Sequence, residues 1–139
     1  AADLLRLIPG LKVVVTDYAA PGHMCSAVAP VPAAMKDIVR SCVDLTAAHD
    51  TDTLVTVFHS CQRLLCGLAT TDGIKVINYV NLLMEAMGKA TAPDEYAQWK
   101  NAGSEAAIME TIGAERIAKI GAEFFAKQVM PELRKLPEK

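Results

Sequence analysis

The feature that most limits the fold is an alternation of short strand-like and helix-like segments in the first two thirds of the chain. Runs rich in β-branched residues favour strands, and apolar residues that recur every three to four positions favour helices. The strand-like runs are LKVVVTDY (11–18), TLVTVF (53–58) and IKVINY (74–79). Because strands separated by helices usually pair in parallel through crossovers, this order predicts an α/β fold with a short parallel sheet.

Three helices are expected to follow these strands. In the first, over about 35–49, apolar residues fall on one face at the spacing of a helix. The second covers about 60–70, and the hydroxyl of Ser60 is expected to cap its first turn. The third covers 80–88 and is expected to close at Gly88, because glycine readily adopts the left-handed conformation that ends a helix.

The last third of the chain shows no strand-like run. We therefore predict two parts, an α/β domain over 1–89 and an all-helical C-terminal extension over 90–139 that packs on it. The last helix is expected over about 114–129, with Pro131 and Pro137 ending it, since proline interrupts helical hydrogen bonding.

Composition excludes several classes of protein. The chain has 139 residues, of which 52% are hydrophobic and 22% are charged, with a net charge of −2. This suits one ordinary core and argues against nucleic acid as a partner, which requires clustered Lys and Arg. No apolar run approaches the ~18 residues of a membrane span. We expect a cytoplasmic protein with reduced cysteines, and the abrupt start at Ala1 indicates a piece of a longer protein.

Two His-x-Cys pairs are the strongest candidates for a site. His23 and Cys25 lie in the loop after the first predicted strand, and His59 and Cys61 follow the second. In a parallel sheet both loops leave the carboxyl edge, where ligands usually bind. The four side chains could hold zinc in tetrahedral geometry, with the two sulfurs on the order of 4 Å apart. The alternative is that they are polar loop residues without a metal.

The remaining cysteines fit a packing role. Cys42 lies on the apolar face of its helix, and Cys66 follows Cys61 by one and a half turns and is expected on the packed side. Cys61 itself lies near a helix N-terminus, where a thiolate is stabilised, so a redox or nucleophilic thiol is a further alternative. That thiol would need His59 as its base, and residues two positions apart at the start of a helix tend to diverge.

Four phrases of the sequence resemble a known family. They are LLRLIPGLKVV, GHMCSA, TLVTVFHSCQRLL and IKVINYVNLLMEAMG, which together cover about residues 4–88. They resemble the cysteine-rich CCG domain, which occurs in heterodisulfide reductase and in related iron–sulfur components of glycolate and lactate oxidoreductases. The family pattern is a single Cys, then a Cys-Cys pair, then Cys-x-x-Cys.

The resemblance implies a degenerate, C-terminal half of a CCG domain. The Cys-Cys pair falls on Met24-Cys25 and the Cys-x-x-Cys on Phe58 to Cys61, so each doublet keeps only its second cysteine. Since iron–sulfur clusters normally take four cysteines, a cluster on Cys25 and Cys61 would need His23, His59 or another segment to complete it. Zinc is the alternative ion.

The implied function is a part of a heterodisulfide reductase-like electron-transfer oxidoreductase complex, with no catalytic residue of its own. The implied partners are the other half of the CCG subunit and a ferredoxin-like or flavin subunit. A structural or assembly module without redox activity, or a zinc-binding domain, is the alternative, because half of each cysteine doublet is missing.

Overall fold

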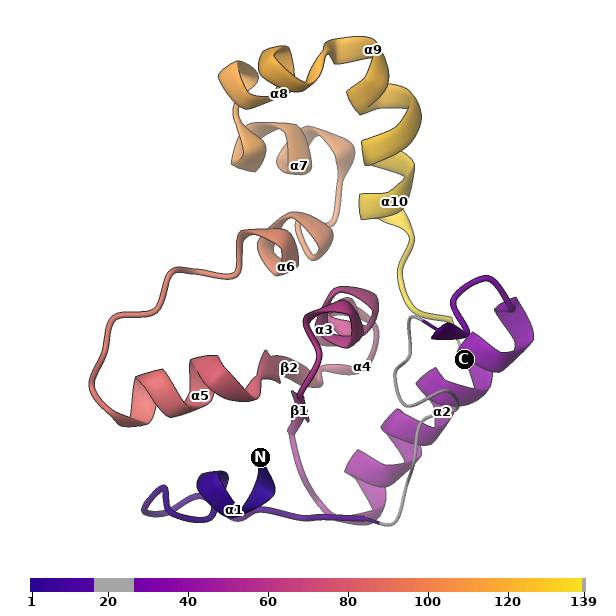
Figure 1. The fold of residues 1–139 in the computed structure, drawn as a ribbon. Helices are drawn as coiled ribbons and strands as arrows, with labels where there is room; N and C mark the ends of the chain where they lie inside the picture. The colour runs from indigo at the N-terminus through magenta and orange to yellow at the C-terminus, as the bar shows by residue number, and fades with distance from the viewer. Residues whose placement is uncertain (17–26, 139) are drawn as a thin grey trace.

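The computed structural model describes residues 1–16 and 27–138 (Figure 1). Its sheet consists of β1 (Thr53–Thr56) and β2 (Lys75–Asn78), which pair in parallel with Thr53 opposite Lys75 and Thr56 opposite Asn78. The connection between them contains α3 (His59–Leu65) and α4 (Leu68–Asp72). The predicted α/β fold, with a short parallel sheet and a helical C-terminal region, is therefore confirmed.

The strand predicted over 11–18 is wrong for the residues that can be compared. Residues 11–16 form neither helix nor strand, and 17–18 lie outside the described residues. They follow a single turn of helix, α1 (Ala2–Leu5). Val15 in this segment is 58% exposed. A β-branched run becomes a strand only when it pairs and packs, so the local pattern alone was misleading here.

Helix α2 (Pro32–Ala48) confirms the first predicted helix. Pro32 stands at its first position, where the missing N–H of proline has no partner to lose. The helix buries Ile38, Val39 and Cys42. These residues form the core of the α/β part with side chains from α3, α4 and the residue before β2, which are Cys61, Leu65, Leu68 and Ile74.

The segment predicted as one helix over 60–70 is divided into α3 and α4 at Cys66 and Gly67. Gly67 lies against the C-terminal tail, and a Cβ placed on it would be 2.5 Å from Cδ of Pro137. Helix α4 ends at Gly73, whose φ of 69° is left-handed. The next helix, α5 (Tyr79–Ala86), is capped by the Asn78 side chain, which accepts the N–H of Val80.

Gly88 closes α5 as predicted. It has a φ of 66°, and its N–H donates to the carbonyl of Glu85 while the N–H of Lys89 donates to that of Met84. This pair of bonds satisfies two carbonyls that the end of a helix would otherwise leave unpaired.

The C-terminal part is a lobe of short helices, drawn in orange and yellow at the top of Figure 1. Its own core contains Ile108, Ile112, Phe125, Met130 and Leu133. The lobe consists of α6 (Glu95–Lys100), α7 (Glu105–Ile112), α8 (Ala114–Ile120), α9 (Ala122–Phe124), the π-helix η3 (Phe125–Val129) and α10 (Met130–Arg134). All of these elements except α9 supply side chains to the core or pack against it.

The single helix predicted over 114–129 is wrong in both its continuity and its end. Gly121, with φ 96° and ψ 119°, separates α8 from α9 because that conformation is not helical. Pro131 does not end the helical region. It lies in the first turn of α10, where its missing N–H is tolerated, after the wider turn of η3.

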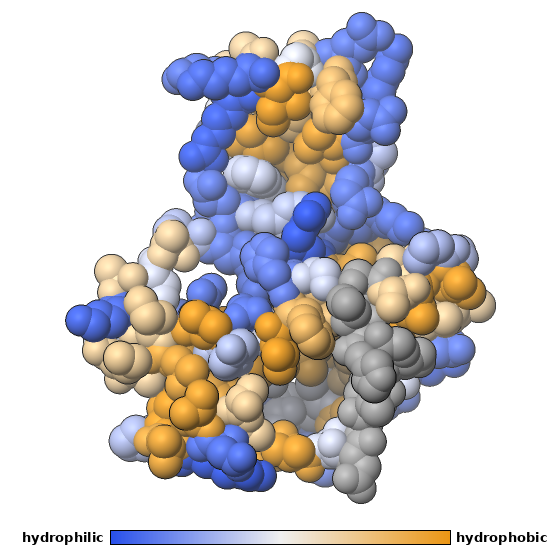
Figure 2. Space-filling view, in the orientation of Figure 1, coloured by the Kyte–Doolittle hydropathy of each residue, from blue (hydrophilic) through white to orange (hydrophobic). Residues whose placement is uncertain are grey.

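Over residues 1–16 and 27–138, no helix has both the length and the apolar character that crossing a bilayer requires. Hydrophobic side chains nevertheless appear on the surface, both around α1 and α5 and in the middle of the C-terminal lobe (Figure 2).

Candidate functional site

His59 and Cys61 lie in the first turn of α3, directly beyond the carboxyl end of β1. Phe58, with extended φ and ψ of −94° and 135°, precedes the helix and serves as its N-cap residue. The N–H of Cys61 donates to the carbonyl of Phe58 at 3.1 Å. The expectation that Ser60 caps this helix is wrong, because the helix begins one residue earlier and has no side-chain cap.

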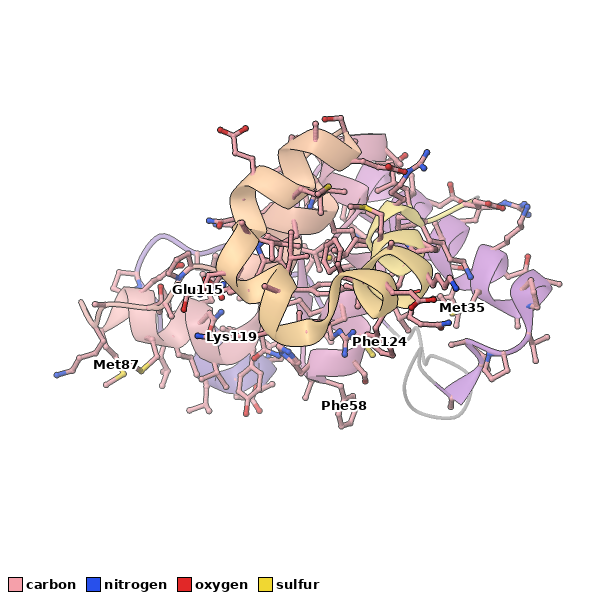
Figure 3. The ribbon with its side chains drawn as sticks, turned by 90° about the horizontal axis from the view of Figure 1, so that it is seen from above. Met35, Phe58, Met87, Glu115, Lys119 and Phe124 are labelled. Carbon is pink, nitrogen blue, oxygen red and sulfur yellow. The ribbon has the colours of Figure 1, made fainter. Side chains whose placement is uncertain are left out.

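The two side chains of this pair point in different directions. His59 is exposed, whereas Cys61 is buried in the core against α2. This difference in burial agrees with the divergence expected of two residues that are two positions apart at the start of a helix. The same edge of the sheet exposes two apolar residues, Val57 at 53% and Phe58 at 46%. Phe58 projects away from the body of the molecule in Figure 3.

Cys42 packs in the core, as predicted. It is 5% exposed and belongs to the same cluster as Cys61. Burial raises the pKa of the Cys42 thiol to about 11, and the nearby charge of Cys61 raises it further in the same direction. The Cys42 thiol is therefore protonated at neutral pH, and a protonated thiol is a poor metal ligand.

Cys66 also lies on the packed side, as predicted, at the C-terminal end of α3. It is 2% exposed, and its sulfur donates to the carbonyl of Arg63 at 3.5 Å. Burial raises the pKa of this thiol to about 11, although the Lys100 ammonium lowers it in part. Cys66 therefore shares with Cys42 the properties of a packing cysteine.

The other half of the predicted site, His23 and Cys25, lies outside the described residues. The distance between the Cys25 and Cys61 sulfurs stays a prediction for that reason. Within residues 1–16 and 27–138, no group of three or more His, Cys, Asp or Glu side chains could hold a metal ion. This part of the chain supplies Cys61 and His59, which do not by themselves fit a four-thiolate cluster or a complete zinc site.

Sequence reasoning missed a second group of polar side chains, where α3 meets the C-terminal lobe. Gln62 is only 3% exposed, and its Nε2 donates to Oδ2 of Asp94. The other carboxylate oxygen of Asp94 accepts the N–H of Ala97 at 3.0 Å and so caps α6. The Gln62 Oε1 atom is buried without a hydrogen-bond partner among the described residues.

Lys100 is the charged centre of this junction. It is 5% exposed, and its Nζ donates to the carbonyl of Glu132 at 3.0 Å. The ammonium lies 5.7 Å from the ring centroid of Tyr96, and the guanidinium carbon of Arg63 lies 4.6 Å from the same centroid. Burial lowers the pKa of Lys100 and raises that of Tyr96, because it disfavours the charged form of each.

Asn101, the residue after α6, connects the helical lobe to the end of α3 and to α4. Its Nδ2 donates to the carbonyl of Cys66 at 3.1 Å, and its Oδ1 accepts the hydroxyl of Thr70 at 2.5 Å. Together with the Gln62–Asp94 hydrogen bond and the contact of Arg63 with the Tyr96 ring, these bonds make a polar joint between the α/β part and the helical lobe. The sequence signal that could have located it is Pro93-Asp94-Glu95, a typical helix start that places Asp94 as an N-cap.

Comparisons with protein-family models, with curated proteins and with solved structures find no match. The fold and the site define a small α/β protein with a helical extension. Its chemistry has to be argued from the arrangement of its own residues.

Proposed function

We propose that this chain is part of a heterodisulfide reductase-like electron-transfer complex, in which Cys61 is one ligand of a metal centre completed from outside the described residues. The observation that carries the proposal is the position of Cys61, in the first turn of the helix that follows the carboxyl end of a parallel strand. Ligands of α/β proteins usually bind at this edge. The sequence resemblance motivates the choice of family, and the position of Cys61 beyond β1 supports a ligand site at this edge of the sheet.

The described residues provide too few ligands to complete a metal centre. Because Cys61 is buried and His59 is exposed and points elsewhere, the described residues offer Cys61 as one ligand. Cys25, His23 and a segment of the other half of the CCG subunit would supply the rest. An iron–sulfur cluster at this place would carry single electrons, whereas zinc would only stabilise the fold. The described residues alone complete neither, and we derive no electron path through them.

Exposed apolar residues at the same edge support a macromolecular partner. Val57, Phe58 and Val80, which lie at the ends of β1 and β2 or just beyond them, are 53%, 46% and 46% exposed. Within residues 1–16 and 27–138 the parallel sheet has two strands, whereas parallel sheets are normally covered on both faces and usually have more strands. A partner segment that packs here would cover these side chains and bring its ligands to Cys61.

The second candidate is an assembly module without redox chemistry. It is favoured by the burial of all three described cysteines, Cys42, Cys61 and Cys66, which are 5%, 8% and 2% exposed. In this case the cysteines serve packing, and the cluster-binding pattern is a remnant.

Serine variants separate the two candidates when the chain is purified together with its neighbouring polypeptides. Cys61 and Cys42 belong to one core cluster and have similar exposure, 8% and 5%, so a packing role makes Cys61→Ser and Cys42→Ser equally harmful. A ligand role makes Cys61→Ser and Cys25→Ser lose iron, sulfide or zinc while Cys42→Ser retains them. If all three variants keep the same metal content and bind the partner, the electron-transfer proposal is wrong and the assembly module stands.

A further inference from the structure

An apolar trough lies in the C-terminal lobe, far from Cys61 in the fold. In Figure 2 the upper lobe shows hydrophobic side chains in its centre and hydrophilic side chains along its rim. Two adjoining hollows of about 510 and 450 Å³ form the trough, and they share Met109, Ile117 and Ala122. The larger hollow is lined by Glu105 and Met109 of α7, and the smaller one by Met109 and the residue that follows α7, Gly113. The two hollows therefore follow one another along α7, and the trough is elongated in that direction.

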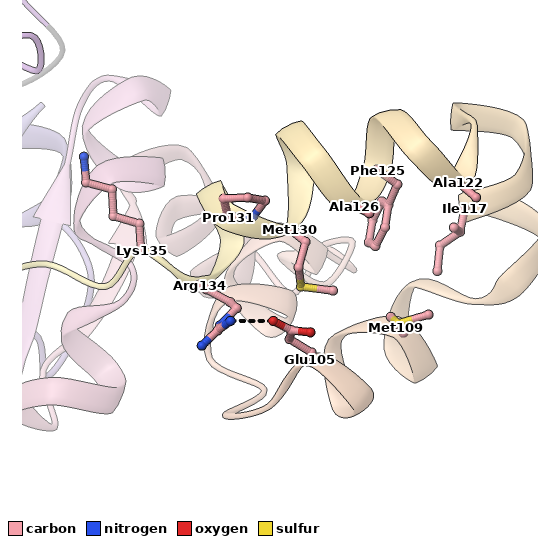
Figure 4. A pocket seen from close by; sticks show the side chains of 10 residues that line it. All are labelled: Glu105, Met109, Ile117, Ala122, Phe125, Ala126, Met130, Pro131, Arg134 and Lys135. Carbon is pink, nitrogen blue, oxygen red and sulfur yellow. Dashed lines mark hydrogen bonds and ion pairs between the residues drawn. The ribbon is translucent and has the colours of Figure 1, made fainter.

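Two glycines create the trough. Gly113 and Gly121 have φ values of 87° and 96°, and they break the chain into short helices that turn around a hollow where one long helix would leave none. One side is formed by α7, with Glu105 and Met109, and the other by α9 to α10, with Phe125, Met130 and Arg134 (Figure 4). Methionine side chains are flexible and adapt to the shape of an apolar guest.

The larger hollow has a charged end. Arg134 forms an ion pair with Glu105 there, whereas Phe125 and Ile117 lie toward the opposite end (Figure 4). Lys135 also lines this hollow, but its side chain points away from the pair in Figure 4. The trough therefore offers an apolar channel that ends at one guanidinium.

The Arg134–Glu105 pair is suited to exchange. The two side chains are 62% and 54% exposed, and an exposed ion pair contributes little to stability. The planar guanidinium of arginine binds a carboxylate through two parallel hydrogen bonds. A ligand carboxylate that replaces Glu105 would keep this interaction and add the burial of its apolar body against Met109, Met130 and Ile117.

We propose that this trough binds an amphipathic carboxylate with a linear alkyl chain, whose head group pairs with Arg134 and whose chain lies along the trough. Small-molecule sites typically combine an apolar wall with a few polar groups that fix the orientation of the ligand, and this open trough has both. The elongated shape favours a chain over a ring system, and the single guanidinium at one end favours one anionic head group.

Decanoate is the probe, and the chain carries its own reporter. Its single tryptophan, Trp99, packs against the same core as Phe125 and Met130, so its fluorescence should change when the trough fills. We expect saturable binding of decanoate below its micelle concentration and roughly tenfold weaker binding of decan-1-ol, which lacks the charge. No saturable change, or equal affinity for the alcohol, would overturn the proposal.

Charge variants test the head-group site. We expect Arg134→Gln to weaken decanoate binding roughly tenfold and Glu105→Gln to strengthen it, because Glu105 competes with the ligand for Arg134. The matched control is Arg116→Gln. Arg116 pairs with Glu95 at 2.9 Å and is similarly exposed, but does not line either hollow. Equal weakening in the control, or weaker binding in Glu105→Gln, would contradict the proposed pairing.

A filled trough provides the last test. Ala126 is exposed and lines the larger hollow, so Ala126→Phe should occupy the space without disturbing the core. We expect this variant to keep the circular dichroism spectrum and melting temperature of the parent chain and to lose decanoate binding. Unchanged binding would show that decanoate lies elsewhere and would overturn the proposal.

Discussion

Gly67→Ala tests how the C-terminal tail packs on the helix pair that carries Cys61. Gly67 has φ −65° and ψ −14°, values that any residue adopts, so alanine adds no backbone strain there. The added Cβ would lie 2.5 Å from Cδ of Pro137 and 3.1 Å from Cδ2 of Leu136. Since the proline ring is rigid, the tail has to move or the contact has to be strained.

The two contributions have opposite signs. Replacing glycine by alanine in a helical conformation stabilises the folded chain by about 0.5–1 kcal/mol through the entropy of the unfolded state. Overpacking against a rigid neighbour costs about 1–3 kcal/mol. We therefore expect Gly67→Ala to lower the free energy of unfolding of the full chain by roughly 1 kcal/mol. In a chain that ends at Lys135 the same change should be neutral or stabilising.

Urea denaturation of the parent chain and of Gly67→Ala, each at full length and ending at Lys135, measures this difference. The change in the denaturation midpoint at constant slope gives the change in the free energy of unfolding. Gly73→Ala is the control in both chain lengths. Its φ is 69° and its Cβ would meet nothing within 4 Å, so its cost is backbone strain and should not depend on the tail. An equal effect of Gly67→Ala with and without residues 136–139 would show that the tail is not what opposes the added Cβ.

Two further predictions concern buried groups. Burial, and then the charge of Cys61, raise the pKa of Cys42 from 9.0 to about 11. Between these two values the thiol ionises in the unfolded chain but not in the folded chain, so the free energy of unfolding falls as the pH rises from 9 toward 11. Urea melts at about pH 8 and about pH 10.5 should show an alkaline loss smaller by about 2 kcal/mol in Cys42→Ala, and an equal loss would contradict this. Asp94→Ala should cost about 2–3 kcal/mol and Ser104→Ala about 1 kcal/mol, although both cap a helix, because only Asp94 also accepts the buried Gln62 amide. In a Gln62→Met background the two costs should become similar, and a persistent gap would show that Gln62 is not the cause of the difference.

Elements defined by local patterns could be predicted from the sequence. The strands at 53–58 and 74–79 have β-branched runs with a short helical connection, and α2 has an apolar face and a proline at its start. Their pairing and burial follow from those patterns. The run at 11–18 has the same composition, yet over 11–16 it forms no strand, because a strand also needs a neighbour that the local sequence does not specify.

Local sequence patterns did not predict how the C-terminal lobe is divided into short helices or which residues form the polar joint. A glycine such as Gly121 can lie inside a helix or interrupt it, and a proline such as Pro131 can end a helix or begin one. Here Gly121 interrupts the helix and Pro131 lies in the first turn of α10, and tertiary packing decides between these alternatives. The packing roles of Cys42 and Cys66 followed from helical spacing, whereas the contact of Gln62 with Asp94 joins residues 32 positions apart. No periodicity predicts a contact of that range.

X-ray absorption at the iron and zinc edges, on the chain purified with its neighbouring polypeptides, tests directly whether Cys61 is a metal ligand. We expect sulfur scatterers, at about 2.3 Å for zinc, and the loss of one of them in Cys61→Ser but not in Cys42→Ser. A sulfur shell that is unchanged in Cys61→Ser, or a preparation that contains neither metal, would contradict the assignment of Cys61 as a ligand.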